Sequence, residues 1–367
     1  MTYDLLHSPG NPRNSEGSFI KLNDNRIMLV YTKYNGQRGG DHSSANLVGI
    51  YSSDNGISWG DERIIVENDA VNVMSVSLLR LQDGRIALVY LRKSNIPGCS
   101  LTEEVEVCDC RPLIRFSSDE GNTWTNPIDI CNYPSATYLV LNNDRLVQLS
   151  SGRLIIPVAH HHITSKGAMA ARAEGFFFLS DDNGQTWRES KECCYGPQWL
   201  TSGLREPGVI ELKDQTLYAW WRTNSRCQYK AFSTDGGDSW STPIPAPEFM
   251  GPESPLSLKR NPYTGILYAI WNDWSPERSV PFKLGVWGRT PLVIAKSCDE
   301  GKSWTNHYVI ESAPDHGYCY TGMFFLGPDK LLLEYCCGGG DPSQIPLYDS
   351  RIRVFSLSLL EEEDSNV

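Results

Sequence analysis

Carboxylate, guanidinium and tyrosine side chains stand where several apolar, strand-like runs of the sequence begin. Guanidinium groups bind a carboxylate through two parallel hydrogen bonds, and a carboxylate beside a tyrosine can accept the phenolic proton. These residue types could therefore hold an acidic ligand and attack it. For a single asparagine or serine in such a position, a hydrogen bond to a neighbouring backbone is the more frequent role. The candidate positions are 13–16, Asn72, 143–145, Arg205, Glu206, Glu253 and 318–320.

The runs that follow these residues are predicted to be hairpins. Each has an apolar strand, a short turn rich in Asn, Asp or Gly, and a second apolar strand, which is the pattern of an antiparallel β-hairpin. Six such hairpins occur, at 18–31, 76–90, 144–157, 207–221, 255–271 and 321–335.

A second repeat, Ser-x-Asp-x-Gly-x-Ser/Thr-Trp, lies between the hairpins. Its Asp bonds to the backbone that follows and its Gly supplies a positive φ, so each copy is predicted to be a turn with the Trp ring buried beneath it. The Asp residues are separated by 65, 63, 53 and 64 residues, which indicates a closed repeat architecture. We expect these Trp residues to serve folding and to lie far from any site. The five copies span 52–59, 117–124, 180–187, 233–240 and 297–304.

Six hairpins, five of them followed by a further strand and such a turn, predict an all-β, six-bladed β-propeller of four-stranded sheets. A last strand at 351–357 is expected to pair beside the N-terminal residues and close the ring. Because inner strands line the central channel, the candidate side chains would gather at one mouth. We expect a single domain over 1–358 and a solvated acidic tail over 359–367. Long inserts would emerge on the faces, where they can line a pocket; they lie at 95–110, 160–173 and 274–289.

The net charge of the chain limits the classes of partner that it is expected to bind. The net charge is −11, from 33 Lys and Arg against 44 Asp and Glu, and an acidic surface disfavours nucleic acid and anionic membrane. The sequence contains no run of 18 apolar residues, so we expect no transmembrane helix. The N-terminus has no basic start followed by an apolar core, so we expect no secretory signal and a cytoplasmic location.

Two groups of residues could suggest a metal. Cys108 and Cys110 form a C-x-C pair rather than the paired C-x₂-C motifs of a strong zinc site, and free thiols in a reducing cytosol are the favoured interpretation of the 11 cysteines. Consecutive residues at 160–162, all histidine, point in different directions, so one site would use at most two of them. A solvated insert that touches substrate is favoured there, and we expect neither a metal nor an organic cofactor.

The five turns and six hairpins resemble those of the sialidase (neuraminidase) superfamily, six-bladed propellers that cleave terminal sialic acid. The turns correspond to the Asp-box, or BNR repeat, of that family, and the resemblance covers nearly the whole chain. Binding propellers also carry this repeat, so the site residues are compared one at a time.

The resemblance implies three catalytic residues. Glu206 opens the fourth hairpin, as the family's glutamate does. Tyr320 stands nine residues before Asp329, where the family has its nucleophilic tyrosine, and Tyr318 is the less well placed neighbour. Asp41 lies in the loop before the strand of the first Asp-box, the place of the acid/base aspartate.

The resemblance also implies a cluster of arginines that binds the substrate carboxylate. Arg222 follows the glutamate at sixteen residues, and Arg289 stands ten residues before the Asp of the fifth Asp-box, as in the family. The family's first arginine belongs to an Arg-Ile-Pro motif, but the same register here gives Ser-Glu-Gly-Ser at 15–18. Arg13 lies two residues earlier, and Arg205 is another candidate to supply the guanidinium. Arg38 and Arg145 are further candidates.

These residues imply an exo-acting, retaining glycoside hydrolase that releases a terminal acidic sugar, with sialic acid as the leading candidate. The partner would be a glycan or glycoside. The missing Arg-Ile-Pro motif keeps two alternatives open. One is a propeller that binds glycans or proteins without catalysis. The other is a glycosidase, lyase or intramolecular transferase of the same fold that acts on a different sugar.

Overall fold

Short apolar runs separated by Asn, Asp and Gly turns fold as antiparallel strands, as the hairpin pattern predicts. The computed structural model describes residues 1–96, 108–164, 169–341 and 344–362. In these residues the helical elements are the 3₁₀ turn η1 (Leu284–Val286) and the short α1 (Leu359–Glu362), so the prediction of an all-β chain is confirmed. Neither is long and apolar enough to cross a membrane.

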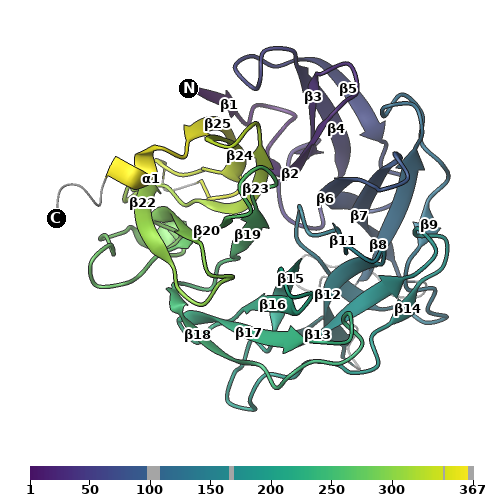
Figure 1. The fold of residues 1–367 in the computed structure, drawn as a ribbon. Helices are drawn as coiled ribbons and strands as arrows, with labels where there is room; N and C mark the ends of the chain where they lie inside the picture. The colour runs from purple at the N-terminus through teal and green to yellow at the C-terminus, as the bar shows by residue number, and fades with distance from the viewer. Residues whose placement is uncertain (97–107, 165–168, 342–343, 363–367) are drawn as a thin grey trace.

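The strands form separate sheets that lie around a common centre (Figure 1). The first sheet holds β2 (Asn14–Lys21), β3 (Ile27–Tyr34), β4 (Ala45–Ser52) and β5 (Gly60–Val66). The next contains β15 (Arg205–Glu211), β16 (Leu217–Arg222), β17 (Cys227–Ser233) and β18 (Ile244–Met250). The following sheet has β19 (Ser257–Arg260), β20 (Leu267–Asn272), β21 (Leu292–Ser297) and β22 (Thr305–Glu311).

A larger sheet lies between the first two of these in the chain. Its strands are β6 (Asn72–Arg80), β7 (Ile86–Asn95), β8 (Cys108–Ser117), β9 (Ile128–Asp129), β10 (Tyr138–Val140), β11 (Val147–Gln148), β12 (Leu154–Ile163), β13 (Met169–Ser180) and β14 (Arg188–Glu189). Strands β8 and β10 are joined in parallel by the single residue pair Cys110 and Tyr138.

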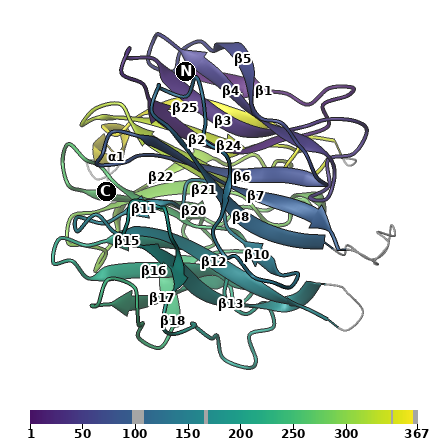
Figure 2. The ribbon, with the colours of Figure 1, turned by 90° about the vertical axis from the view of Figure 1, so that its right-hand side faces the viewer.

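The two ends of the chain meet in the last sheet. Strand β1 (Thr2–Leu5) pairs antiparallel with β25 (Ser350–Ser356), which continues into β24 (Lys330–Cys336) and β23 (Cys319–Phe325). The Arg351 guanidinium binds the Asp4 carboxylate across this pairing at 2.8 Å. The predicted pairing of the final strand with the N-terminal residues is confirmed, and Figures 1 and 2 show β1 beside β25.

The five Asp-containing turns share one set of hydrogen bonds. In the fourth copy, Asp235 accepts the Ser233 hydroxyl at 2.8 Å, the Ser239 hydroxyl at 2.6 Å and the Ser239 backbone N–H at 2.9 Å. Burial acts to raise the pKa of Asp235, but these donors outweigh it and lower the pKa to about 2. The expected burial of the tryptophans holds for Trp59 and Trp240. The other three are partly exposed, at Trp124, Trp187 and Trp304.

One expectation about the periphery changes. The segment at 359–362, expected as the start of a solvated tail, forms α1 instead, because Leu360 is buried in the core of the last sheets and its carbonyl accepts a hydrogen bond from Asn306. The insert at 160–173 forms the ends of β12 and β13 together with a segment at 165–168 outside the described residues. Most of the insert at 95–110, including Cys99, also lies outside them.

Candidate active site

An edge strand in each of four sheets carries a β-bulge at the same place. The paired register shifts between Ser15 and Ser18 in β2, and it does so at the equivalent points of β6, β15 and β23. One residue in each bulge has a positive φ, which costs a residue other than glycine roughly 1–3 kcal/mol. The four residues are Glu16 (φ 61°), Ser75 (φ 61°), Glu206 (φ 46°) and Tyr320 (φ 57°).

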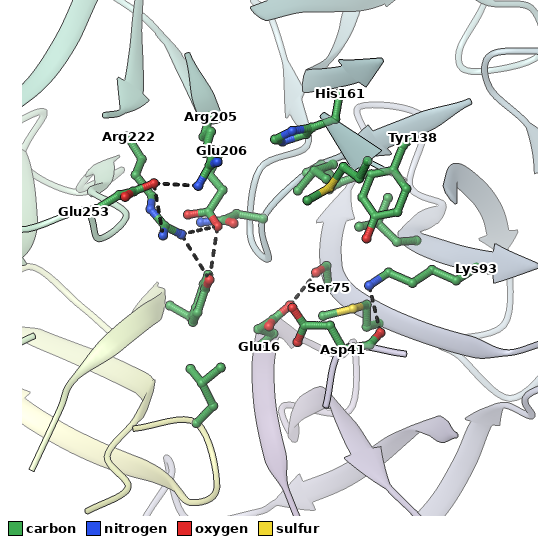
Figure 3. A pocket seen from close by; sticks show the side chains of 18 of the residues that line it. Glu16, Asp41, Ser75, Lys93, Tyr138, His161, Arg205, Glu206, Arg222 and Glu253 are labelled. Carbon is green, nitrogen blue, oxygen red and sulfur yellow. Dashed lines mark hydrogen bonds and ion pairs between the residues drawn. The ribbon is translucent and has the colours of Figure 1, made fainter. Parts of the chain in front are cut away.

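These four bulge residues line one cavity of about 530 Å³. A bulge re-aims a side chain out of the regular alternation of its strand, which is how four separate sheets direct polar groups into a shared space. The cavity wall also holds a balanced set of charges; Figure 3 shows Glu206, Arg222, Arg205 and Glu253 on one side of the space and Glu16, Asp41 and Lys93 on the other.

Tyr320, Glu206 and Arg222 form a hydrogen-bonded group. The Tyr320 hydroxyl donates to Glu206 Oε1 over 3.1 Å, and Arg222 Nη1 donates to the same oxygen over 2.6 Å. Arg222 Nη1 also lies 3.5 Å from the Tyr320 hydroxyl oxygen. Strands β15 and β16 pair Arg205 directly with Arg222, so the bulge at the next residue turns Glu206 toward the same side.

The electrostatics keep the proton on Tyr320 and the charge on Glu206. Burial acts to raise the pKa of Glu206, but Arg222 and Arg289 outweigh it and lower the pKa below its ordinary value. Burial and the Glu206 carboxylate raise the pKa of Tyr320 well above its ordinary value. An ionised acceptor therefore stands beside a neutral phenol, which is the arrangement required for general-base activation of a tyrosine.

Arg289 and Arg222 flank the tyrosine. The Arg289 guanidinium lies 5.3 Å from the centre of the Tyr320 ring and 5.0 Å from that of Trp287. Its Nη1 donates to Cys319 Sγ over 3.1 Å. Both guanidinium groups line the cavity, where together they could bind an anionic group of a ligand.

Glu253 is held between the guanidinium groups of Arg205 and Arg222. Arg205 Nη1 donates to Glu253 Oε1 over 2.6 Å, and Arg222 Nη2 lies 3.7 Å from the same oxygen. Arg222 thus contacts two carboxylates of the protein, those of Glu206 and Glu253. A carboxylate of a ligand could replace one of them at Arg222 only if that ion pair were broken.

The opposite wall is built on Arg13, which does not itself line the cavity. Its side chain is 1% exposed, and it donates to Glu16 Oε1 over 2.8 Å and to Asp41 Oδ1 over 2.6 Å. Glu16 also accepts a hydrogen bond from the Ser75 hydroxyl. The guanidinium expected to contact substrate therefore lies behind two carboxylates, because the bulge presents Glu16 to the cavity and leaves Arg13 as its buried counter-ion.

The two carboxylates of this wall have opposite pKa shifts. Burial raises the pKa of Glu16, and Arg13 opposes this only in part. Burial also acts to raise the pKa of Asp41, but Arg13 and Lys93 outweigh it and hold the pKa well below its ordinary range. The Asp41 side chain is 54% exposed, so a ligand can reach it, whereas that of Glu16 is 4% exposed.

Six of the seven residues expected at the site lie together in this cavity; they are Tyr320, Glu206, Asp41, Arg222, Arg289 and Arg205. Tyr318 is buried away from the cavity, and Arg145 donates to the Leu256 backbone from a buried position. Sequence reasoning missed several lining residues, namely Ser75, Lys93, Tyr138 and Trp287, whereas His161 belongs to the run for which contact with substrate was expected. Ser75 could have been found, since it precedes the second hairpin as Glu206 precedes the fourth.

The geometry can be compared with known proteins. The model of the BNR repeat-like domain family matches residues 32–327. The chain belongs to this family. Of curated relatives, a sialidase of Paraclostridium sordellii is 28% identical over 232 residues, which are 58% of this chain and 54% of that protein. Matches to the curated relatives cover between 16% and 58% of their lengths, so this BNR repeat-like chain spans about half of those relatives or less.

Solved structures share the fold over nearly the whole chain. A Hadza microbial sialidase superposes with a TM-score of 0.73 and 15% identity, covering 98% of this chain and 69% of that one. The intramolecular trans-sialidase of Ruminococcus gnavus superposes with a TM-score of 0.71 and 16% identity, covering 97% of both chains. The BNR repeat-like chain therefore has the β fold of these sialidase structures.

Proposed function

We propose that this protein is an exo-acting, retaining glycoside hydrolase of the sialidase type, with Tyr320 as nucleophile and Glu206 as its base. The observation that carries the proposal is the 3.1 Å hydrogen bond from the Tyr320 hydroxyl to Glu206, with Arg222 bound to the same carboxylate oxygen. Relatives named sialidases, both in sequence and in fold, support the reaction class.

The strands would form six blades around this site. The larger sheet is held together between β8 and β10 by one parallel residue pair, whereas its other strand neighbours pair antiparallel. Divided there, β6 to β9 and β11 to β14 make two four-stranded blades, and β10 is an added strand on the second. The remaining sheets have four strands each. The candidate site would then lie at one mouth of a six-bladed propeller.

The residues support a double-displacement mechanism. The Tyr320 oxygen attacks the anomeric carbon as its proton passes to Glu206, and protonated Asp41 gives its proton to the leaving-group oxygen as that bond breaks. Despite burial, Arg13 and Lys93 lower the pKa of Asp41 in the free protein, so substrate binding must raise it for this step. Asp41 then takes a proton from water, which attacks the same carbon and releases the sugar, while Glu206 returns the proton to Tyr320. A neutral tyrosine suits a substrate whose own carboxylate would repel an Asp or Glu nucleophile.

The substrate we infer is a terminal acidic sugar, with sialic acid as the leading member. Arg222 and Arg289 lie on either side of the tyrosine and could bind its carboxylate. A second candidate is a different sugar, and Glu16 favours it. The Glu16 carboxylate lies in the stretch 15–18, where the family has the arginine of its Arg-Ile-Pro motif. A carboxylate there would accept hydrogen bonds from hydroxyls or an amine rather than bind an anion.

Turnover of a panel of fluorogenic glycosides separates these candidates. We expect hydrolysis of an α-sialoside, and not of a uronide or a neutral deoxy-sugar glycoside of matched leaving group. Hydrolysis of one of the other glycosides instead would keep the tyrosine mechanism and transfer the proposal to that sugar. Binding of a glycan with no turnover of any glycoside at long incubation would replace the enzyme with a binding protein. Mass and NMR spectra of the product distinguish hydrolysis from intramolecular transfer.

The role of Asp41 predicts a dependence on the leaving group. Asp41→Asn should lower kcat by about 10²–10⁴-fold for a glycoside with a poor, alkyl-type leaving group, because that oxygen needs a proton as the bond breaks. For an activated aryl leaving group, the loss in the first step should be much smaller. The test is the slope of log kcat against the pKa of the leaving group, measured over a series of aglycones of increasing acidity.

Glu16→Gln is the matched comparison, since both carboxylates bind Arg13 on the same wall. We expect this variant to leave the slope against aglycone acidity unchanged. A steep slope in Glu16→Gln, together with a flat one in Asp41→Asn, would assign the proton donor to Glu16, whose pKa is raised by burial.

A further inference from the structure

The histidine run on β12 divides between two faces of its sheet. His161 lines the candidate active site (Figure 3), and its Nδ1 lies 2.8 Å from the Ala170 carbonyl oxygen. Successive residues of a strand point to opposite faces, so His160 and His162 share the other face. Antiparallel pairing places Glu174 of β13 directly opposite His160.

The three side chains on that face form a compact cluster. The His160 and His162 ring centres are 4.5 Å apart, and His162 Nε2 lies 3.3 Å from Glu174 Oε1. One ligand atom from each of the three residues lies within 4.8 Å of the other two. Because 60% of the His162 side chain is exposed, its ring has room to rotate toward an ion shared with His160 and Glu174.

A second cavity, of about 410 Å³, adjoins the cluster. His160 and His162 line it together with the segment from Tyr133 to Thr137. The Thr137 hydroxyl lies 3.4 Å from His160 Nε2. The ligand set thus opens onto a space large enough for water or for a small ligand, separate from the cavity that holds Tyr320.

We propose that His160, His162 and Glu174 bind a divalent transition-metal ion of the zinc type. Two imidazoles and one carboxylate suit Zn²⁺, which takes nitrogen and oxygen ligands in tetrahedral geometry. Three protein ligands leave the fourth position to water or to a group from the second cavity. The two imidazole nitrogens, which are borderline ligands, disfavour Mg²⁺ and Ca²⁺, which select oxygen ligands.

Such an ion would stabilise the extended ends of β12 and β13. These ends border the segment at 165–168, and β12 carries His161 into the candidate active site on its other face. An ion bound to both strands would fix their separation and so hold His161 in place. Thermal stability should therefore respond to the ion independently of any glycosidase activity.

Zinc titration tests the proposal. The full chain is dialysed against EDTA, transferred to chelator-free buffer and titrated with ZnCl₂ by calorimetry, with Cys298→Ser as the background because Cys298 is an exposed thiol. We expect one tight equivalent and a rise in Tm with added zinc. His162→Ala should weaken this site at least tenfold and remove the Tm rise, and its 60% exposed side chain makes unfolding by this change unexpected.

His316→Ala is the matched control. His316 also pairs with a carboxylate, that of Asp315 at 2.8 Å, but no second imidazole belongs to that pair in the described part of the chain. Its removal should leave zinc binding unchanged. Glu174→Gln is a second, nearly isosteric test that should also weaken binding. An absence of zinc binding in the parent protein would overturn the proposal. So would zinc binding in both His162→Ala and Glu174→Gln that is as tight as in the parent protein.

Discussion

Tyr320→Phe is expected to lower kcat by roughly 10³-fold or more, because it removes the attacking oxygen and leaves only binding and the other polar groups to act on the substrate. The ring itself is retained, together with its contact to the Arg289 guanidinium at 5.3 Å. The lost hydroxyl makes one hydrogen bond to Glu206 and a longer contact to Arg222, so the change in the free energy of unfolding should be about 1–2 kcal/mol. Steady-state kinetics and urea unfolding measure the two quantities.

Tyr318→Phe is the control, since it removes the same atom two residues away. The Tyr318 side chain is buried outside the cavity, so its hydroxyl cannot meet a bound sugar. We expect full activity within a few-fold. Loss of activity in the Tyr318 variant alone would shift the assignment of the nucleophile by two residues. Retention of activity in both variants would exclude a tyrosine nucleophile and leave the fold without this mechanism.

Repeating patterns made the fold predictable. Hairpins and Asp-containing turns each depend on residues close in sequence, so their positions follow from local turn chemistry. The proximity of Glu206 and Arg222 could be predicted for the same reason. Both belong to one hairpin, and its turn sets the register in which the two strands pair. Tyr320, in contrast, comes from a different sheet, and the start of the sixth hairpin together with the resemblance to sialidases indicated that it would face the same cavity.

The environment of Arg13 was not predictable in the same way. Sequence position placed this arginine near the site but could not show which side of β2 it would occupy, because a bulge changes the alternation of a strand by one residue. In the structure the Glu16 side chain lines the cavity, and the Arg13 side chain is buried behind it. Lys93 was missed because it lies near the far end of a long strand, where no turn marks its position.

The lowered pKa of Glu206 has a consequence for the pH dependence of stability. In the folded protein Arg222 and Arg289 hold the pKa below the 4.5 of an ordinary glutamate, despite the opposing effect of burial. Ionised Glu206 therefore stabilises the fold above the unfolded-state pKa. This contribution is lost as the pH falls from about 4.5 through the folded-state pKa, where the carboxylate becomes protonated.

Glu206→Gln should affect both activity and stability. Without the carboxylate, nothing beside Tyr320 accepts its proton, and loss of a general base lowers kcat by about 10²–10⁴-fold. Arg222 also loses its partner at 2.6 Å, while both side chains of that pair are largely buried. Breaking a buried pair from one side costs roughly 3–5 kcal/mol of unfolding free energy, since it leaves an uncompensated charge.

The matched variant is Glu253→Gln, which neutralises the other carboxylate near Arg222. Its pair with Arg222 is longer, at 3.7 Å. Arg205 Nη1 binds the same Glu253 oxygen at 2.6 Å, but the two side chains of that pair are 23% and 33% exposed, so solvent compensates much of the loss. We expect less than about 1 kcal/mol from this change and a kcat close to that of the parent protein.

Urea unfolding at several pH values adds the decisive comparison. The stability difference between the parent and Glu206→Gln should be largest near neutral pH and shrink below about pH 4.5, because the parent's own carboxylate is then protonated. A difference that stays constant down to about pH 3, well below the ordinary glutamate range, would mean that the Glu206→Gln change acts through packing. The electrostatic role of Glu206 in holding Arg222 and activating Tyr320 would then have to be abandoned.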